Sequence, residues 1–335
     1  RIFRKFPFWH VTLIYKQTKK GSPMLHQING LHHVTSLASS ASENNTFFSE
    51  GLGLRRIKAT VNFDNPEVYH LYYGDEVGNA GSVLTYFPFP NIALGRRGTG
   101  EVGTTAFSIS MGSIPFWRER LHAIGAGHAT PTNRFGEQRL EFYGPDGDHF
   151  ALVEAADDRT PWTTDAIPAE HAIRGFHSAD MRVNDAAPMI ELLIFMGYSV
   201  SATEGAITRL TVADGNAANK IDLIELPNAE KSEEGAGSVH HIAFSVSTKA
   251  EQLAVQSALT DAGYRVTDVR DRNYFHAIYF RTPAGVLFEV ATDEPGFTAD
   301  EDAASLGTAL KLPEQHEKRR ARLQKTLEPL KNLQH

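Results

Sequence analysis

The apolar and polar positions of the chain repeat four times in one order: an apolar strand, a helix, and three further strands. Each helix is expected to end at a glycine, and the four glycines, Gly53, Gly125, Gly197 and Gly263, are 72, 72 and 66 residues apart. A helix commonly ends in a left-handed residue that glycine adopts at little cost, so one structural role explains all four. The regular spacing predicts four modules of one design.

The fourth module shows the order most plainly. Its first strand is expected at 242–247, and Thr248 is suited to cap the helix that follows. Three more strands are expected at 264–269, 275–280 and 286–291. The fold class is therefore α+β, with four tandem βαβββ modules forming two domains.

Breaks in the pattern divide the chain. Residues 157–171 contain Pro161 and Pro168 and interrupt any regular structure, which predicts a boundary between an N-terminal domain at 28–156 and a C-terminal domain at 172–294. Residues 295–335 are expected to form a helical tail whose charges run from acidic to basic. Residues 1–23 are basic and aromatic without a cleavage site, so they are interpreted as a non-native leader, with Met24 as the native start.

Composition narrows the function. The 335 residues are 41% hydrophobic and 22% charged, without the long apolar run of a membrane helix. A net charge of -7 argues against nucleic acid as a partner, because phosphate binding needs a basic surface. The chain has no cysteine, which excludes disulfides and thiolate ligands and suits a reducing compartment, so we expect a cytoplasmic protein.

Two histidine pairs carry the candidate chemistry. His32-His33 and His240-His241 each open a run that is typical of a strand, so one imidazole of each pair faces the interior. Glu289 stands in the middle of an apolar strand, where burial without a partner costs several kcal/mol. Two imidazoles and a carboxylate form the facial triad of non-haem Fe(II) oxygenases, which leaves positions open for substrate and O2.

These motifs resemble the vicinal oxygen chelate fold, which includes glyoxalases, bleomycin-resistance proteins and extradiol ring-cleaving dioxygenases. Within that fold, the chain is most similar to ring-cleaving enzymes of the hydroquinone 1,2-dioxygenase type, over roughly residues 28–330. The resemblance rests on four stretches taken together: Gly-Leu-His-His-Val-Thr, Val-His-His-Ile-Ala-Phe, residues 270–281, and Phe-Glu-Val-Ala-Thr-Asp at 288–293. It implies that His32, Thr35, His240, Arg272 and Tyr279 line the catalytic pocket.

Comparison of the four repeats selects the ligands. The second module has Thr105-Ala106-Phe107 in place of a histidine pair, and Ala151 in place of Glu289. In the third module Ser178 aligns with the ligand position. The expected metal ligands are therefore His33, His241 and Glu289, from the first and fourth modules, and His177 is the competing ligand if that alignment is off by one residue. The first and fourth modules must then meet across the chain, which sequential pairing of modules does not deliver.

Tyr86 is expected to occupy the place in the first module that Glu289 takes in the fourth. A glyoxalase-type isomerase has a second glutamate there, so an aromatic residue favours an open site and O2 chemistry. The predicted function is a ring-cleaving dioxygenase that uses Fe(II), with Mn(II) also compatible, to insert O2 into a hydroquinone-type ring. Its expected partners are a small aromatic substrate and O2, without nucleic acid or membrane, and a homo-oligomer remains open.

Three alternatives stay open beside it. One is a catechol extradiol dioxygenase, and another is a metal-dependent isomerase or lyase on the same fold. The third is a metal-free binding protein of the resistance type, in which replacement of Glu289 by alanine would leave ligand binding intact.

Overall fold

A computed structural model describes residues 24–334, so the expected leader at 1–23 lies outside the described residues, and Met24 is the first described residue. The first module contains a π-helical segment, η1, after its short helix. Its elements are β1 (Leu31–Ala38), α1 (Ala41–Asn45), η1 (Thr46–Gly51), β2 (Arg55–Val61), β3 (Tyr69–Gly74) and β4 (Val83–Pro88).

The next two modules repeat the order exactly as strand, helix and three strands. The second consists of β5 (Glu101–Ile109), α2 (Ile114–Ala123), β6 (Gly127–Arg134), β7 (Glu137–Tyr143) and β8 (His149–Glu154). The third consists of β9 (Gly175–Val183), α3 (Ala187–Phe195), β10 (Tyr198–Glu204), β11 (Ile207–Val212) and β12 (Lys220–Glu225).

The fourth module and the tail complete the described chain. The module consists of β13 (Val239–Val246), α4 (Lys249–Asp261), β14 (Arg270–Asp271), β15 (Phe275–Arg281) and β16 (Leu287–Pro295). The tail contains η2 (Phe297–Ala299), η3 (Ala303–Ser305), η4 (Glu314–Arg319) and α5 (Arg320–Thr326). The predicted repeat and α+β class are confirmed, and Gly53, Gly125, Gly197 and Gly263 all have φ between 69° and 97°.

One expected strand of the fourth module is largely missing. Residues 264–269 are irregular, and β14 has only two residues. The side chain of Thr267 explains this, because its Oγ1 accepts the backbone N–H of Tyr279 at 3.0 Å, in place of a carbonyl of a regular strand ladder. The Thr248 cap is as expected, with a reciprocal capping box to Glu251.

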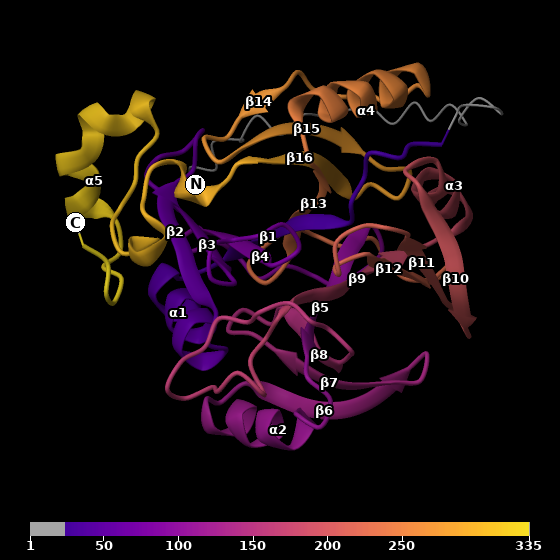
Figure 1. Cartoon of the computed structure of the whole chain (residues 1–335), viewed down its shortest axis with the longest axis horizontal. Helices are drawn as coiled ribbons and strands as arrows, with labels where there is room; N and C mark the ends of the chain where they lie inside the picture. Colours follow the sequence, from indigo (N-terminus) through magenta and orange to yellow (C-terminus); the bar gives the residue numbers. More distant parts are fainter. Residues whose placement is uncertain (1–23, 335) are drawn as a thin grey trace.

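The strands form two curled eight-stranded sheets (Figure 1). The first sheet has the order β14-β15-β16-β13-β1-β4-β3-β2, which joins the fourth module to the first. The second sheet has the order β10-β11-β12-β9-β5-β8-β7-β6, which joins the third module to the second. Each sheet thus draws one module from either side of the boundary expected at 157–171. The ranges 28–156 and 172–294 therefore do not each build a sheet of their own.

Alternation along the central strands separates two faces of the first sheet. Ile242, Phe244 and Phe288 point into the main apolar core, which also holds Val255 and Leu259 of α4. Alternate residues point to the opposite face, called the inner face below, where Ala243 and Ala291 belong to a second apolar cluster. A side chain that interrupts the apolar pattern at an inner position therefore enters the cleft that this sheet encloses.

The tail is tied to the outer strand β2 of the first sheet (Figure 1). Lys58 is completely buried, and its Nζ contacts the Phe297 carbonyl at 3.0 Å, Asp300 Oδ1 at 2.7 Å, and the carboxylate of Glu301. The Lys311 amide donates to the Ala59 carbonyl at 2.9 Å. Together these contacts fix the segment that begins at η2 against the inner face.

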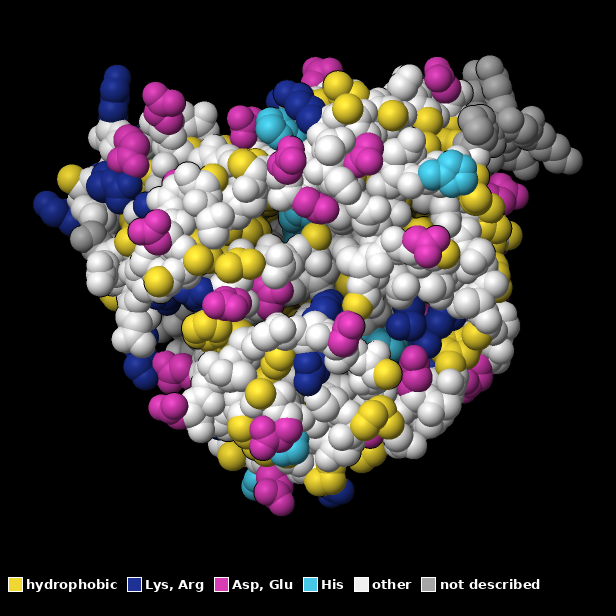
Figure 2. Space-filling view, in the orientation of Figure 1, with side chains coloured by type: hydrophobic (Ala, Val, Ile, Leu, Met, Phe, Trp, Pro, Cys, Tyr) yellow, Lys and Arg dark blue, Asp and Glu magenta, His cyan; other side chains and the backbone are white. Residues whose placement is uncertain are grey.

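The outer surface shows acidic and basic side chains intermixed over the visible face (Figure 2). Within the part of the chain that the structure describes, no helix combines the length and apolarity required to cross a membrane.

Candidate metal centre

Three adjacent strands at the middle of the first sheet carry the predicted ligands. His33 lies on β1, His241 on β13 and Glu289 on β16. In the sheet register His33 is opposite Ala243, which in turn is paired with Glu289. The three side chains share the inner face, and their candidate ligand atoms all lie within 4.8 Å of one another.

The distances suit one shared cation. His33 Nε2 and His241 Nε2 are 3.3 Å apart, and Glu289 Oε2 lies 3.5 Å from the first and 3.0 Å from the second. For ligand bonds of about 2.1 Å, two ligands at roughly right angles to each other are about 3.0 Å apart. The arrangement therefore has the size of one face of a coordination polyhedron.

Burial gives an independent test of this fit. Glu289 is 0% exposed, and within the described residues neither carboxylate oxygen has a hydrogen bond of good geometry, although Oε2 lies close to both imidazoles. Burial alone would raise the pKa of Glu289, but the His33 and His241 imidazoles hold it well below its usual range. Burial lowers the pKa of His241 despite the nearby carboxylate. An ionised carboxylate beside a neutral His241 imidazole is the protonation state that a metal requires.

The other member of each histidine pair orients the first. His32 Nδ1 lies 2.9 Å from His33 Nδ1, and His240 Nδ1 lies 2.7 Å from His241 Nδ1. Burial is the main reason that the pKa values of His32 and His240 are both lowered to about 3, so both rings are neutral. With its Nδ1 engaged, each inner imidazole presents Nε2 to Glu289, as metal-binding histidines commonly do.

The remaining predicted pocket residues gather around this cluster. Tyr279 is paired with Glu289 in the sheet register, and its ring lies edge-on to His241 with centroids 5.9 Å apart. The Arg272 guanidinium donates to the Tyr279 hydroxyl at 3.2 Å. Burial opposes the charge of Arg272, but Tyr279 and Glu289 raise its pKa, so it stays cationic. Burial, and next the charge of Glu289, raise the pKa of Tyr279, which keeps its proton.

Thr35, the fifth predicted pocket residue, is buried on β1 directly opposite His241. Its hydroxyl lies 2.9 Å from the hydroxyl of Thr85 on the neighbouring strand β4. The structure thus gathers all eight predicted site residues around one part of the first sheet.

The prediction for Tyr86 was wrong by one position. Thr35 pairs with Thr85 as Ala243 pairs with Glu289, so Thr85 takes the place of the carboxylate in the first module. Tyr86 points to the opposite face, where it is buried in the main core and donates to Asp148 at 2.8 Å. The expected consequence is unchanged, because threonine supplies no second carboxylate to the centre.

Two inner-face residues were not found from the sequence. His70 and Tyr72 lie on β3, and the Tyr72 hydroxyl is 2.8 Å from His70 Nδ1. His70 Nε2 is in turn 2.8 Å from the hydroxyl of Thr85. The available signal was a lone histidine in the apolar stretch Tyr-His-Leu-Tyr-Tyr at 69–73, at the same alternation as Tyr72.

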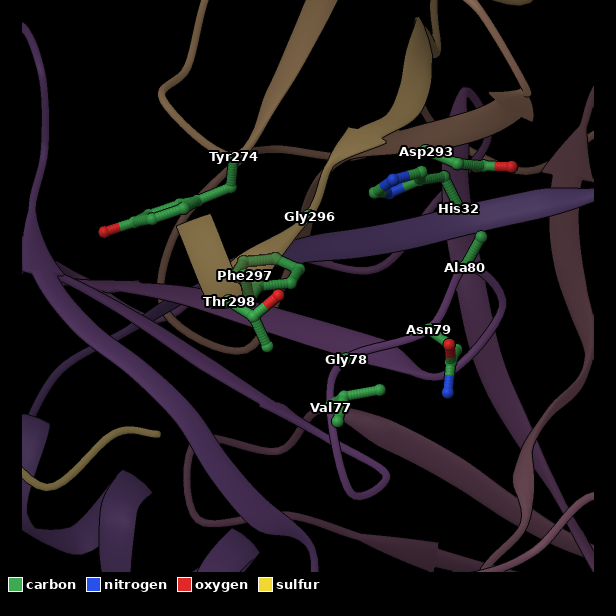
Figure 3. Close-up of a pocket in the computed structure, with 10 residues that line it drawn as sticks. All are labelled: His32, Val77, Gly78, Asn79, Ala80, Tyr274, Asp293, Gly296, Phe297 and Thr298. Carbon is green, nitrogen blue, oxygen red and sulfur yellow. The ribbon is translucent and has the colours of Figure 1, made fainter. Parts of the chain in front are cut away.

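A cavity of about 470 Å³ is lined by His32, the neighbour of the candidate ligand His33 (Figure 3). Tyr274 and Phe297 line one side, and His32 and Asp293 lie across from them, above a loop that carries Val77. His32 is therefore in contact both with this cavity and with His33. The lining is aromatic at Tyr274 and Phe297 and polar at His32 and Asp293.

His177, the competing ligand, lies in the second sheet. Its Nε2 contacts Glu137 at 3.0 Å and its Nδ1 contacts Ser178 at 3.1 Å. Asp222 pairs there with Asp180 as Glu289 pairs with Ala243, but Arg209 binds Asp222 through two nitrogens at 2.7 and 2.9 Å. A guanidinium cation thus neutralises the carboxylate at the corresponding place of the second sheet.

Comparison with known proteins agrees with this geometry. Residues 175–290 match the model of the Glyoxalase/Bleomycin resistance protein/Dioxygenase superfamily. "Putative ring-cleaving dioxygenase MhqO" of Bacillus subtilis (strain 168) is 40% identical over 302 residues, which cover 90% of this chain and 96% of the relative. The chain belongs to the glyoxalase, bleomycin resistance and dioxygenase superfamily.

Other members of this superfamily refine the likeness. Chlorohydroquinone/hydroquinone 1,2-dioxygenase of Sphingobium indicum is 33% identical, with 87% of this chain and 93% of the relative covered. A crystal structure of a "putative dioxygenase" from Bacillus subtilis superposes with a TM-score of 0.88 at 39% identity, over 91% of this chain and 98% of that one. Glyoxalase I of Zea mays shares the fold, with a TM-score of 0.61 at 14% identity over 79% and 92% of the two chains. The predicted fold and the ring-cleaving dioxygenase class are confirmed at the level of the superfamily.

Proposed function

We propose that the protein is an Fe(II)-dependent ring-cleaving dioxygenase that inserts O2 into a hydroquinone-type ring. The observation that carries this proposal is the cluster of His33, His241 and Glu289, in which a fully buried carboxylate has no hydrogen bond of good geometry within the described residues. Two nitrogen ligands and one oxygen ligand on one side of a cation suit non-haem iron, and manganese accepts the same donors. The hydroquinone dioxygenase of Sphingobium indicum among the relatives supports the substrate class.

In the proposed reaction His33, His241 and Glu289 hold the metal. The metal, when bound, would acidify a coordinated phenol and bring it together with O2. His32 and His240 fix the two ligand rings through their Nδ1 contacts. Both rings are buried and neutral before the reaction begins, so each can pass a proton to or from an oxygen of the bound substrate.

The para arrangement of a hydroquinone assigns a second task to the protein. Its two hydroxyls lie on opposite sides of the ring, so one metal binds only one of them. The other hydroxyl needs a hydrogen-bonding partner. The Tyr279 hydroxyl serves as this partner, and it is polarised by the Arg272 guanidinium that donates to it. The apolar cavity wall of Tyr274 and Phe297 suits a methyl or chlorine substituent on the ring.

The test is O2 uptake by the iron-loaded protein with methylhydroquinone, chlorohydroquinone and catechol, measured with an oxygen electrode. We expect O2 uptake with the two hydroquinones. A His33→Ala variant should show no O2 uptake and should bind less than one iron per chain. Uptake with catechol alone would retain the dioxygenase and refute the para-diol substrate. Absence of uptake despite one iron per chain would refute the dioxygenase and favour an isomerase or lyase.

A further inference from the structure

Four side chains form a continuous hydrogen-bonded network across the inner face of the first sheet. The Tyr72 hydroxyl lies 2.8 Å from His70 Nδ1, and His70 Nε2 lies 2.8 Å from Thr85 Oγ1. Thr85 Oγ1 then lies 2.9 Å from Thr35 Oγ1. All four side chains are buried, with His70 the most exposed at 8%. We call these residues the Tyr72 network.

The Tyr72 network reaches from the cavity wall to the metal centre. At one end, the Tyr72 ring packs edge-on against Phe297, which lines the cavity, with centroids 5.1 Å apart. At the other end, Thr35 lies opposite His241 in the sheet register and two residues after His33. The network therefore ends beside His33 and His241, which would hold the metal to which a substrate oxygen binds.

The protonation states of its members restrict how the hydrogens are arranged. Burial, and next the neighbouring His33, lower the pKa of His70 well below its ordinary value, so the ring is neutral and has a single N–H. Burial raises the pKa of Tyr72 well above its ordinary value, so the phenol keeps its proton. The His70 ring therefore either accepts from Tyr72 at Nδ1 and donates from Nε2 to Thr85, or donates from Nδ1 to Tyr72 and accepts from Thr85 at Nε2.

The Tyr72 end favours the first arrangement. His70 is the hydrogen-bond partner of the Tyr72 hydroxyl within the described residues. If Tyr72 accepted from His70, its own buried O–H would lack an acceptor, which costs about 1–3 kcal/mol. If Tyr72 donates to Nδ1, then His70 donates from Nε2 to Thr85. When Thr85 in turn donates to Thr35, the one free O–H belongs to Thr35, at the end of the network that faces the metal centre, where water or a substrate oxygen can accept it.

We propose that His70 is a positioning residue that, through Thr85, holds the Thr35 hydroxyl as a hydrogen-bond donor to an oxygen of the phenol bound at the metal centre. This inference rests on the proposed function and identifies the feature of the ligand that Thr35 recognises. A donor suits a phenol oxygen that has lost its proton, because hydrogen bonds to an ionised oxygen are the stronger ones. An acceptor at the same place would instead repel it.

The test must separate this role from simple packing. The His70 ring lies between Tyr72 and Phe87, with centroids 4.0 and 4.2 Å away, so its removal would also leave a cavity. Thr85 offers a cleaner pair of variants. Thr85→Val keeps the shape and removes the hydroxyl that joins His70 to Thr35, whereas Thr85→Ser restores the hydroxyl with a smaller side chain.

The first measurement is the Kd of methylhydroquinone for the iron-loaded protein without O2, followed by kcat and KM in its presence. We expect Thr85→Val to weaken Kd, and to lower kcat/KM, by about ten- to a hundred-fold, the worth of one hydrogen bond to a charged group. Iron content should be unchanged, and Thr85→Ser should recover most of the loss. Equal Kd values for wild type and Thr85→Val, or a Thr85→Ser variant as impaired as Thr85→Val, would overturn the proposal.

The second measurement needs neither turnover nor substrate. Nitrogen-15 NMR of the protein loaded with diamagnetic Zn(II), with His70 assigned by its absence from His70→Gln, reports which ring nitrogen carries the proton. We expect the Nε2–H form in the wild type and a mixture of forms in Tyr72→Phe. The Nδ1–H form in the wild type would overturn the proposed direction of the network.

The two measurements distinguish the ways in which the reasoning can fail. A wild-type protein that has the Nε2–H form but neither binds nor oxidises methylhydroquinone refutes the proposed function, and with it the role of Thr35 toward a phenol. A protein that oxidises hydroquinones but has the Nδ1–H form retains the proposed function and refutes the network.

Discussion

Replacement of Glu289 by glutamine should abolish most of the stability that the protein gains from its metal. A ligand that binds only the folded state stabilises it by about 2.7 kcal/mol when present at 100 times its Kd. Glu289 is the one carboxylate of the His33–His241–Glu289 cluster, and its oxygen lies 3.0 Å from His241 Nε2. If its loss weakens Kd about a hundred-fold, the same metal concentration equals the new Kd, and the gain falls to about 0.4 kcal/mol.

The assay is urea unfolding of each protein after chelation and again with added Fe(II) or Mn(II) in the absence of O2. Each variant is compared with its own chelated form, so a change in intrinsic stability does not enter the result. Glu137→Gln is the matched control, because Glu137 also contacts a buried histidine, His177 at 3.0 Å, but in the second sheet. The control should retain the full gain. A Glu289→Gln protein that still gains about 2 kcal/mol or more from metal would refute the assignment of this carboxylate.

Three further predictions follow from other parts of the structure. Burial alone would raise the pKa of Glu137, but His177 and Arg209 hold this pKa at about 2, against an ordinary 4.5. The stabilising effect of Glu137 is therefore complete above pH 4.5 and is lost as the pH falls toward 2. Glu137→Gln should flatten that part of the curve of unfolding free energy against pH, and an unchanged slope would contradict the ion pair. Lys58→Met leaves the Glu301 carboxylate buried without its cation, so it should lower the free energy of unfolding by about 3–5 kcal/mol and expose the segment after η2 to protease. The control Arg322→Ala breaks an exposed pair with Glu67 and should change that free energy by less than about 1 kcal/mol. Phe297→Ala removes an aromatic wall of the cavity, so it should raise the KM for methylhydroquinone more than that for unsubstituted hydroquinone while iron content stays constant, and an equal effect on both substrates would place the substituent elsewhere.

The candidate ligands could be predicted from the sequence because each interrupts an apolar strand. A histidine or glutamate in such a strand must face either a partner or an interior site, and the two-residue alternation then selects its face. The same alternation explains the error at Tyr86, since a shift of one residue in the strand assigned to 82–87 exchanges the two faces. Thr85 was missed for this reason, and His70 because nothing local relates one histidine on β3 to its partner on β4.

The hydrophobic pattern of the modules does not predict how they pair, and only the expected shared ligands indicate that the first module meets the fourth. Each module has the same internal pattern, and that pattern is satisfied equally by a neighbour on either side. The choice is made where the first strands of two modules meet, as β1 meets β13 and β5 meets β9. Those contacts depend on side-chain packing between residues about 70 to 210 positions apart, which no local pattern records.

The strands of the second sheet lie, in sequence, between the two parts of the first sheet, and this affects the order in which the sheets can fold. The second sheet draws on one uninterrupted stretch, from Glu101 to Glu225, whereas the first sheet needs both β1 near the start and β16 near the end. During synthesis the second sheet can therefore fold on the ribosome while one edge of β1 in the first module stays unpaired until β13 emerges. Glu289 is the last of the three candidate ligands to emerge, so a chain that stops before it has the two candidate histidines and no carboxylate beside them. For the proposed metal centre, this topology implies that metal binds late, after nearly complete translation.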